Sequence, residues 1–464
     1  MSQDEITGGK LHRLTKLLMD TGEATTIDEA EEKLKGYRLG IHVNREVLDS
    51  QAYQAGLLTA INTGRRCFLG GVLILGDLDV PLKIPWRRFQ TVAEAVQDLQ
   101  GKVVDKLDAS IPLISFSDKL PEGWEGDFGV KPAIRGWSGG ILPIHDQFDF
   151  SGKEMFTPAG VLAGALAVCE AFQFVRGGNS TVGHRSVGIS LWKPARDADW
   201  LNADLGPNLA FLPQKLWLIG LGNLGQAYLW TLGFLPYKAN YKMKDNVKFV
   251  LQDTDLLEEA NDSTSLLTDL SMVGMKKTMT MSDWCEQYGF QTSLIERKFA
   301  DDLIANDDEP HLALCGVDNA EARATLEKAG FKRIIEAGLG KGVEEYLCFR
   351  MHTFPASKSA ESYWAQKSGK DDAEKLIQQP AYQDLYGRGL VDQCGLTELA
   401  GRSVGAPFVG AIAATFVIAE ALRILNGGDA IELIDGDLRS IPTLNKVIPI
   451  QIKLKAFNPG MIKV

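Results

Sequence analysis

A glycine-rich turn between a strand and a helix constrains this chain more than any other feature of its sequence. Residues 215–219 (KLWLI) form a short apolar run typical of a buried strand, and they lead directly into GLGNLG, which contains Gly220, Gly222 and Gly225. The helix-like QAYLWTLG follows. Glycines permit the tight turn, and the N-terminus of a helix offers unpaired N–H groups to anionic oxygens. The pattern predicts a phosphate-binding turn in an α/β domain.

A second strand indicates that the phosphate belongs to a nucleotide. Residues 247–252 (VKFVLQ) are typical of a buried strand, and they end at Asp253, where an acidic residue meets ribose hydroxyls. An NAD-dependent oxidoreductase fits these two features as well as an ATP-binding protein does. The glycine turn and Asp253 therefore leave both classes open.

Further motifs follow in a fixed order and separate the two classes. The first is D-x-D, at Asp253 and Asp255, followed by an asparagine, Asn261, and by G-x-x-K, which ends at Lys277. The last is D-N, at Asp318 and Asn319, with Arg323 five residues after the aspartate. This order resembles the ThiF/MoeB and ubiquitin-activating family over about the second half of the chain. An oxidoreductase would leave the later motifs without an ordered purpose.

The resemblance implies binding of ATP with Mg²⁺. Joining a carboxylate to the α-phosphate of ATP brings two anions together, so a lysine and a magnesium ion must offset the charge. On the family pattern Asp253 binds ribose, Lys277 contacts the phosphates as a catalytic group, and Asp318 holds magnesium. The nucleotide-binding set that the resemblance implies is Gly220, Gly222, Gly225, Asp253, Asp255, Asn261, Lys277, Asp318 and Asn319.

Some of these residues have ordinary structural interpretations as well. Spacing alone selects Lys277 over its neighbour Lys276. Asn319 and Arg323 could equally begin a helix and stabilise it by charge.

The sequence departs from the family pattern after Asn261. Where the family has N-x-x-R, with a phosphate-binding arginine, this chain has Thr264, which carries no charge. Either another basic residue replaces that arginine, with Arg45 and Arg185 of the N-terminal half as candidates, or adenylation is weak or absent.

Cys394 is the predicted nucleophile. It lies shortly before the apolar helix that begins at Pro407, as the reactive cysteine of the family lies before its G-x-x-x-P-x-x-G helix, and it follows the polar, lysine-rich stretch 357–379, which we expect to be exposed and loop-like. A thiolate there would attack the acyl-adenylate and keep the acyl group as a thioester. The alternatives are that Cys394 is a small buried residue, or that Cys348 is the nucleophile. The six cysteines contain no C-x-x-C pair, so no zinc site is expected.

The N-terminal half shows no phosphate-binding pattern but echoes the C-terminal half. Residues 11–36 predict two short helices, the second opened by Thr26 and ended by Gly36, and residues 67–75 and 112–116 predict strands. Two apolar helices, beginning at Pro158 and Pro407, match after a shift of 250 residues, in the pairs Gly160 and Gly410, Ala163 and Ala413, Glu170 and Glu420, and Gly177 and Gly427. The echo predicts a pseudo-dimer within one chain.

The resulting domain prediction has three parts. Residues 1–40 are a helical segment, 41–205 an inactive adenylation-like domain, and 206–464 an active ThiF-like domain with a crossover segment at about 341–406. The fold class is α/β, with a Rossmann-like adenylation domain paired with a degenerate, related N-terminal domain.

Composition excludes two classes of partner. The 49 basic and 60 acidic residues give a net charge of -11, which opposes attraction to nucleic acids and anionic membranes. The N-terminus lacks the basic start and apolar run of a signal peptide, so we expect a cytoplasmic protein. The apolar stretch 408–419 is shorter than the roughly 18 residues that span a bilayer, which favours a buried helix.

The predicted function is ATP-dependent activation of a ubiquitin-like protein with a C-terminal glycine, by adenylation and then thioester formation. A ubiquitin-conjugating-like enzyme is a further expected partner, and bacterial conjugation pathways, including antiviral ones, contain such chains. The alternatives are a nucleotide-binding pseudoenzyme, an NAD-dependent oxidoreductase, and a sulfur-carrier activator, which usually carries the zinc-binding cysteine pairs missing here.

Overall fold

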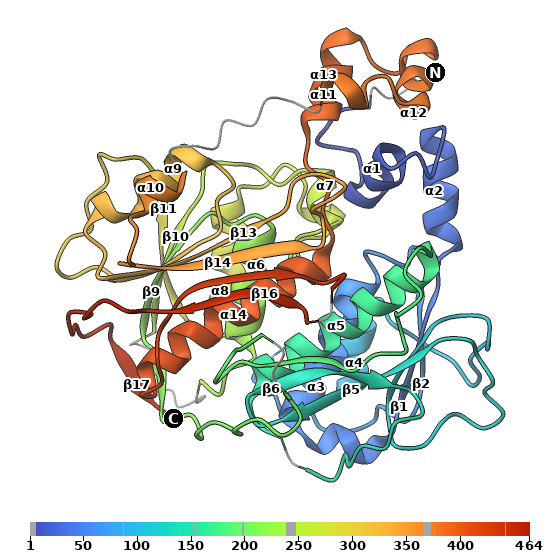
Figure 1. Cartoon of the computed structure of the whole chain (residues 1–464), viewed down its shortest axis with the longest axis horizontal. Helices are drawn as coiled ribbons and strands as arrows, with labels where there is room; N and C mark the ends of the chain where they lie inside the picture. The colour runs from blue at the N-terminus through green and yellow to red at the C-terminus, as the bar shows by residue number, and fades with distance from the viewer. Residues whose placement is uncertain are drawn as a thin grey trace.

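The computed structural model describes residues 6–86, 88–152, 154–196, 199–237, 247–364, 373–440 and 442–464. Two helices, α1 (Arg13–Asp20) and α2 (Ile27–Gly36), precede two α/β units, each built on one sheet (Figure 1). As predicted, α2 begins after Thr26, whose hydroxyl accepts a hydrogen bond from the Glu29 amide (3.1 Å). Only this half of a capping box forms, because the Glu29 carboxylate binds the amide of Thr25.

The first unit contains a seven-stranded sheet in the order β3-β2-β1-β4-β5-β6-β7. The first five strands in that order are parallel, and β6 and β7 are each antiparallel to the preceding strand. The predicted strand over 67–75 begins only at Val72, because Cys67 lies in the turn after α3. The elements are β1 (Leu39–Val43), η1 (Arg45–Asp49), α3 (Gln51–Gly64), β2 (Val72–Leu75), α4 (Val92–Asp98), β3 (Lys102–Val103), β4 (Leu113–Phe116), β5 (Gly129–Arg135), β6 (Ser138–Pro143), α5 (Thr157–Arg176) and β7 (Val187–Ser190).

The second unit contains an eight-stranded sheet in the order β11-β10-β9-β12-β13-β14-β15-β16. Again the first five strands are parallel, and β14, β15 and β16 are each antiparallel to the preceding strand. Its strands are β9 (Lys215–Ile219), β10 (Lys248–Gln252), β11 (Gln291–Ile295), β12 (Leu312–Cys315), β13 (Arg333–Leu339), β14 (Cys348–Phe354), β15 (Ile431–Asp437) and β16 (Leu444–Pro449). A separate pair, β8 (Phe211–Pro213) and β17 (Met461–Lys463), joins the linker to the C-terminal segment.

The two units share one plan. Strand order and the change from parallel to antiparallel pairing match at seven successive positions, and α3 follows β1 as α6 (Asn223–Gly233) follows β9. The predicted class, a Rossmann-like α/β domain paired with a related one, is confirmed. The other helices of the second unit are α7 (Glu259–Asp262), η3 (Leu270–Met272), α8 (Lys277–Gln287), α9 (Ala320–Ala324), η4 (Leu326–Ala329), α10 (Ala360–Trp364), α11 (Ala373–Leu376), α12 (Pro380–Gly387), α13 (Gln393–Gly401) and α14 (Pro407–Leu425).

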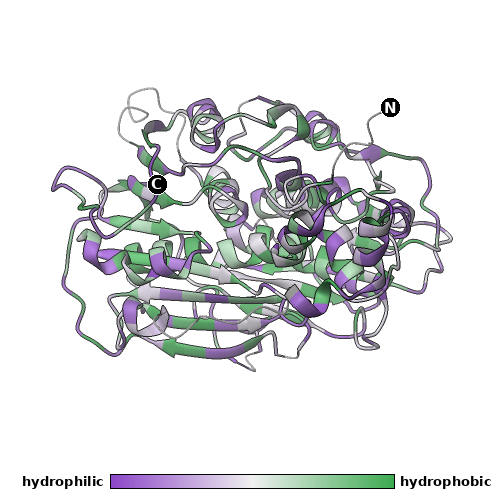
Figure 2. Cartoon of the chain, turned by 90° about the horizontal axis from the view of Figure 1, so that it is seen from above, coloured by the Kyte–Doolittle hydropathy of each residue, from purple (hydrophilic) through white to green (hydrophobic). Residues whose placement is uncertain are grey.

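The echoed helices α5 and α14 pack against each other in the core, with α3 against α5 and α6 against α14 (Figure 1). Gly160 allows α5 to approach α3 closely, since a Cβ there would lie 1.9 Å from the Ala52 carbonyl oxygen. Both helices are long and apolar enough to cross a membrane by length and composition alone, but 89% of each apolar window is buried in the fold. The predicted buried helix over 408–419 is confirmed, and Figure 2 shows the apolar strands and helices enclosed by more polar segments.

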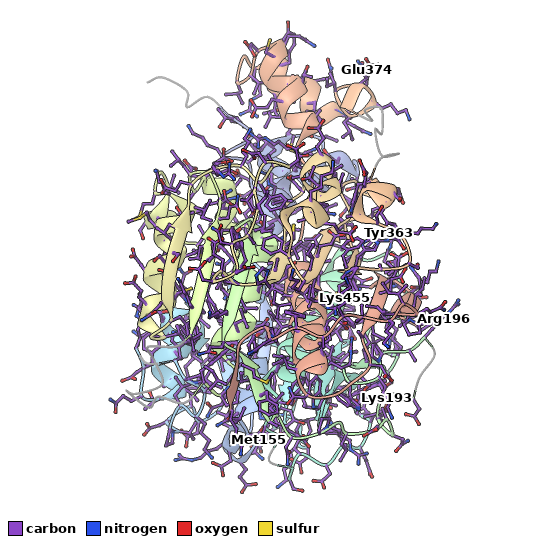
Figure 3. All side chains as sticks on the ribbon, turned by 90° about the vertical axis from the view of Figure 1, so that its left-hand side faces the viewer. Met155, Lys193, Arg196, Tyr363, Glu374 and Lys455 are labelled. Atoms are coloured by element: carbon purple, nitrogen blue, oxygen red, sulfur yellow. The ribbon has the colours of Figure 1, made fainter. Side chains whose placement is uncertain are left out.

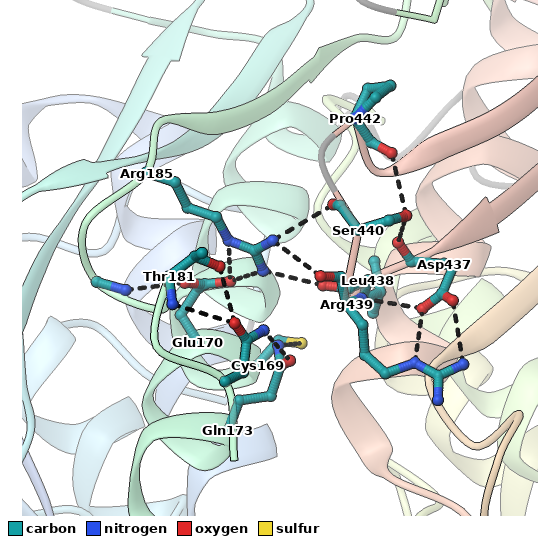
Figure 4. A network of polar contacts seen from close by, with 12 residues as sticks. Cys169, Glu170, Gln173, Thr181, Arg185, Asp437, Leu438, Arg439, Ser440 and Pro442 are labelled. Carbon is teal, nitrogen blue, oxygen red and sulfur yellow. Dashed lines mark hydrogen bonds and ion pairs between the residues drawn. The ribbon is translucent and has the colours of Figure 1, made fainter. Parts of the chain in front are cut away.

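A buried carboxylate of α5 anchors the first unit to the second. Glu170 accepts a hydrogen bond from Arg185 Nε (3.1 Å), and Arg185 Nη2 donates to the carbonyl of Leu438 (3.1 Å) (Figure 4). Arg185 therefore binds across the interface between the units.

The equivalent carboxylate of α14 makes the reciprocal connection. Glu420 pairs with Arg423, whose Nη1 donates to the carbonyl of Leu191 in the first unit (2.5 Å). The match at a shift of 250 residues thus extends from the sequence to two related contacts between the units.

The first unit differs where the second has its glycine turn. After β1 the chain enters Asn44 and η1, and Ser50 Oγ accepts a hydrogen bond from the Tyr53 amide (3.3 Å) at the start of α3. The N-terminus of α3 is therefore capped by the side chain of Ser50, whereas that of α6 has no side-chain cap.

Candidate nucleotide-binding site

The glycine turn joins β9 to α6 and is shaped by close contacts. Gly220 has a φ of 85°, and a Cβ on Gly225 would lie 2.0 Å from the Gly220 carbonyl oxygen. At Gly222 a Cβ would meet no heavy atom within 4 Å, and α6 begins there without a side-chain cap. Gly220 is thus required by its backbone conformation and Gly225 by packing. Gly222 leaves open space at a helix N-terminus, an arrangement that fits a phosphate group.

Asp253 lies beside this turn, at the end of β10. Its carboxylate accepts hydrogen bonds from the amides of Leu221 (2.6 Å) and Asp255 (2.9 Å). The aspartate therefore fixes the turn to the second strand, at the position that the sequence predicted for a ribose contact.

The structure distinguishes the two adjacent lysines. Lys277 is the first residue of α8, is largely buried, and places its Nζ 2.9 Å from Asp255 Oδ2. Lys276 is exposed and pairs with Glu296. Burial raises the pKa of Asp255, but the hydrogen bond and charge of Lys277 outweigh it and hold that pKa below its ordinary value. Lys277, the lysine that motif spacing selected for the phosphate contact, is thus the one that pairs with the D-x-D motif.

Asp318 follows β12, which lies next to β9 in the sheet. It is exposed, and a Cβ on Gly220 would lie 3.1 Å from the amide nitrogen of its neighbour Val317, so Asp318 lies close to the glycine turn. No group of three or more His, Cys, Asp or Glu side chains that could hold a metal occurs among the described residues. A magnesium ion at Asp318 would therefore take most of its ligands from phosphates and water, as this ion commonly does.

Asn319 begins a helix, as its structural interpretation predicts, whereas Arg323 is bound to the main-chain carbonyls of Val317 and Ala337. Asn319 Oδ1 accepts hydrogen bonds from the amides of Glu321 (2.8 Å) and Ala322 (3.3 Å) and so caps α9. Arg323 is buried behind this loop rather than exposed beside Asp318. Asn261 likewise acts locally, since its Oδ1 accepts from the Glu258 amide (2.8 Å).

The segment around Thr264 packs against the N-terminal half. Arg65 of the α3 C-terminus pairs with Asp262 (3.0 Å), and Arg66 donates to the carbonyls of Ser265 (2.9 Å) and Thr268 (2.8 Å). The chain thus supplies arginines to this segment from its first unit.

The two arginines that we named as replacements for the family arginine lie elsewhere. Arg45 pairs with Asp77, and Arg185 is buried against Glu170. Those two predictions are wrong. The arginines that do contact the segment, Arg65 and Arg66, carried no local signal, because the residues that they bind are about 200 positions away.

Cys394 is the exposed member of the six cysteines, at the second position of α13. Figure 1 shows α11, α12 and α13 in a small lobe at one end of the molecule, beyond α1. The lobe is anchored by Lys16 Nζ, which lies 2.9 Å from Tyr382 Oη, and by Tyr382 Oη, which donates to Asp20 (2.5 Å). The structure therefore does not bring Cys394 to the glycine turn.

The crossover segment is partly helical where we expected a loop. Within 357–379 the described residues form α10 and α11, and 365–372 lie outside the described residues. Tyr363 of α10 lies on the body of the molecule, whereas Glu374 of α11 lies in the lobe (Figure 3).

The alternative nucleophile, Cys348, is half-buried and accepts a hydrogen bond from Arg439 (3.7 Å). Burial and the charge of Asp437 raise the pKa of its thiol.

Comparison with known proteins identifies the family. The BilD N-terminal domain matches residues 38–191 and the BilD C-terminal domain residues 212–428. The bacterial E1-like protein BilD of Collimonas sp. (strain OK412) is 39% identical over 432 residues, which cover 93% of this chain and 92% of that protein. The chain belongs to the BilD family of bacterial E1-like proteins. The resemblance to the ThiF/MoeB and ubiquitin-activating family is confirmed, and with it the adenylation type of the α/β fold.

Two solved structures show a distant likeness to this BilD-family chain. The E. coli tRNA N6-threonylcarbamoyladenosine dehydratase TcdA in complex with AMP has 15% identity and a TM-score of 0.29, covering 46% of this chain and 86% of that one. E. coli MccB with MccA-N7isoASN has 14% identity and a TM-score of 0.30, covering 51% and 63%. Values this low carry no inference about activity.

Proposed function

We propose that this BilD-family chain binds ATP with Mg²⁺ at the glycine turn and adenylates the C-terminal carboxylate of a ubiquitin-like protein. The observation that carries the proposal is the meeting of three features: the open N-terminus of α6 at Gly222, the Asp253 carboxylate bound to the turn, and Lys277 held by Asp255. A nucleotide in this place would have its phosphates near a helix N-terminus and an ammonium group, and its ribose near a carboxylate.

The chemistry needs positive charge around the reacting phosphorus. An oxygen of the substrate carboxylate attacks the α-phosphorus, the bond to the β-phosphate oxygen breaks, and pyrophosphate leaves. Lys277 and the amides of α6 offset the negative charge that develops. Asp318 would hold the magnesium ion, which supplies further positive charge when bound.

A second step would transfer the acyl group to a cysteine. The thiolate attacks the acyl carbon of the adenylate, AMP leaves, and a thioester forms. Cys394 is the best candidate because it is exposed, whereas Cys67, Cys169, Cys285 and Cys315 are buried. Since Cys394 belongs to a separate lobe, this step requires the lobe and the glycine turn to approach each other.

The surface beside the site supports a protein as the second substrate. Five large apolar side chains are exposed within 24 residues that contain Lys277, and they are Leu256, Leu270, Val273, Met275 and Met279. Clustered exposed apolar groups mark sites of protein contact. A ubiquitin-like protein, or a conjugating-like enzyme that accepts the acyl group, would provide such contacts in a cytoplasmic, bacterial-type pathway.

Thr264 supports a second candidate, a nucleotide-binding pseudoenzyme that holds a ubiquitin-like partner. Its side chain replaces a charged group of the family pattern, and the arginines nearby are engaged by backbone carbonyls. Binding without adenylation would then be the function.

Thermal unfolding with nucleotides tests the binding part of the proposal. A ligand that binds the native state raises the apparent stability by mass action, so Mg-ATP should raise the unfolding temperature and NAD should not. Asp318→Ala should remove the dependence on magnesium. Equal shifts with both nucleotides, or none with ATP, would favour another nucleotide function.

A further inference from the structure

Arg323 is buried directly behind the loop that carries Asp318. Its Nε donates to the carbonyl of Val317 (2.7 Å) and its Nη2 to the carbonyl of Ala337 on β13 (2.9 Å). The guanidinium group therefore fastens the residue before Asp318 to the neighbouring strand.

The loop is held on its other sides as well. A Cβ on Gly220 would lie 2.8 Å from Val317 Cγ1, so Val317 packs on the glycine turn. Asn319 is fixed by its cap of α9. The exposed Asp318 thus lies between two anchored residues, and its backbone position depends on the Val317 carbonyl that Arg323 binds.

A buried carboxylate holds Arg323 in place. Glu336 Oε2 lies 3.5 Å from Arg323 Nε, and Glu336 Oε1 lies 2.6 Å from His352 Nδ1. Burial raises the pKa of Glu336, but the Arg323 guanidinium and His352 outweigh it and hold that pKa below its ordinary value. The Glu336 carboxyl group therefore lies against the guanidinium group inside the fold and helps to fix its position.

The crossover segment covers this ion pair. The Arg323 guanidinium carbon lies 4.6 Å from the centre of the Trp364 ring, and the His352 ring lies 4.5 Å from that of Tyr363. Both aromatic residues belong to α10, which also packs against α9. A movement of α10 would therefore change the contacts of Arg323.

We propose that Arg323 is the positioning residue that sets Asp318 for the magnesium ion of Mg-ATP, and that α10 of the crossover segment stabilises this setting through Trp364. The inference rests on the proposed function. In it, the arginine that follows D-N positions the metal ligand Asp318 and does not contact a phosphate. Groups that orient a metal ligand from behind commonly change metal affinity when they are replaced.

The test compares two buried arginines. Arg323→Lys keeps the charge but loses the paired contacts to Val317 and Ala337. Arg423→Lys is the matched control, because Arg423 is equally buried, pairs with Glu420 and contacts main-chain carbonyls of Leu191 and Asp429 instead. ATP binding to the full chain is measured by calorimetry, first in EDTA and then over a series of magnesium concentrations.

Arg323→Lys should raise the magnesium midpoint, the concentration that gives half of the gain in ATP affinity, by about tenfold. This is the loss of metal affinity commonly seen when a group that orients a metal ligand is replaced, and ATP affinity in EDTA should stay unchanged. Arg423→Lys should lose thermal stability without moving the magnesium midpoint. Trp364→Leu, which leaves the ion pair intact, should move the midpoint in the same direction by a smaller factor, and it serves if Arg323→Lys does not fold.

Two results would overturn the assignment, and they differ. The first is the same magnesium midpoint in Arg323→Lys, Trp364→Leu and Arg423→Lys, with magnesium-dependent ATP binding in the wild type. It would refute the role of Arg323 and leave the proposed function standing. A wild type that binds ATP without any dependence on magnesium would refute the proposed function and the assignment with it.

Discussion

Replacing Lys277 and Lys276 separately by alanine tests the site most sharply, because the two residues are adjacent in sequence and differ in their surroundings. Lys277 is largely buried and pairs with Asp255 at 2.9 Å, whereas Lys276 is exposed and pairs with Glu296. Each pair has a substantially exposed partner, so breaking the ion pair itself should cost no more than about 1 kcal/mol of stability. Lys277→Ala also loses the packing of a largely buried stem, so it should unfold at a somewhat lower temperature than Lys276→Ala.

The two variants should differ in rate. Removing one electrostatic group that acts in the transition state commonly costs roughly a hundredfold or more, about 2.7 kcal/mol. Lys277→Ala should lose pyrophosphate exchange on that scale, and Lys276→Ala should keep it nearly intact. Asp255→Asn provides a third variant, because it keeps the ammonium group but releases its anchor, and it should lie between the two.

The assay is exchange of labelled pyrophosphate into ATP with a verified ubiquitin-like substrate, alongside thermal unfolding of each variant. Loss of exchange in Lys277→Ala, at an assay temperature well below its unfolding temperature, is the expected pattern. Equal losses in Lys276→Ala and Lys277→Ala would refute the assignment that rests on the buried position of Lys277.

Further predictions concern the turn, the lobe and the pairing of the units. Gly225→Ala should destabilise the fold, because its Cβ would lie 2.0 Å from the Gly220 carbonyl oxygen. Gly222→Ala should fold normally but weaken ATP binding, because its methyl group would enter the open space at the start of α6. Denaturation measures the first effect and calorimetry the second, and equal stabilities of the two variants would contradict the packing argument. Tyr382→Phe should destabilise the lobe by about 1–3 kcal/mol, since Asp20 loses a buried hydrogen bond, and local hydrogen exchange in α12 and α13 should rise. Unchanged protection there would count against the anchor. Cleavage of the linker between 197 and 213 should leave two fragments that co-elute in gel filtration, because α5 and α14 hold the units together; freely separating fragments would disprove the pseudo-dimer.

The core of the candidate site could be predicted because its parts are local and ordered. The ends of β9 and β10 are neighbours in a parallel sheet, so Gly220 and Asp253 had to lie together once both strands were recognised. Motif spacing selected Lys277 over Lys276 as the phosphate contact, and that contact stays a prediction, whereas its burial is seen only in the structure. The repeat of 250 residues predicted the pairing of the two units, and α5 does pack against α14. The repeated glycines serve other contacts, since Gly160 lies against Ala52 of α3 and Gly410 against Asn223 of α6.

Other features depend on contacts that no local pattern records. Arg66 contacts Ser265 across 199 residues, and Lys16 contacts Tyr382 across 366, so neither partner could be inferred from spacing. Arg185 was misassigned for a related reason, since its pairing with Glu170 and its burial at the interface are properties of the packed units. The place of Cys394 in a helical lobe likewise depends on the packing of α12 and α13 against α1, at the opposite end of the chain. Its role as nucleophile stays a prediction, as do the nucleotide contacts and the domain boundaries.

The most direct test of the central claim follows both chemical steps in wild type and Cys394→Ala. With ATP, magnesium and a verified ubiquitin-like substrate, the wild type should exchange pyrophosphate into ATP and form an adduct that dithiothreitol releases. Cys394→Ala should keep the exchange and lose the adduct, because adenylation needs only the phosphate site. An adduct that survives in Cys394→Ala would move the nucleophile to another cysteine, with Cys348 next. Absence of both exchange and adduct in the wild type would contradict the adenylation proposal and leave the pseudoenzyme, with Thr264 as its cause.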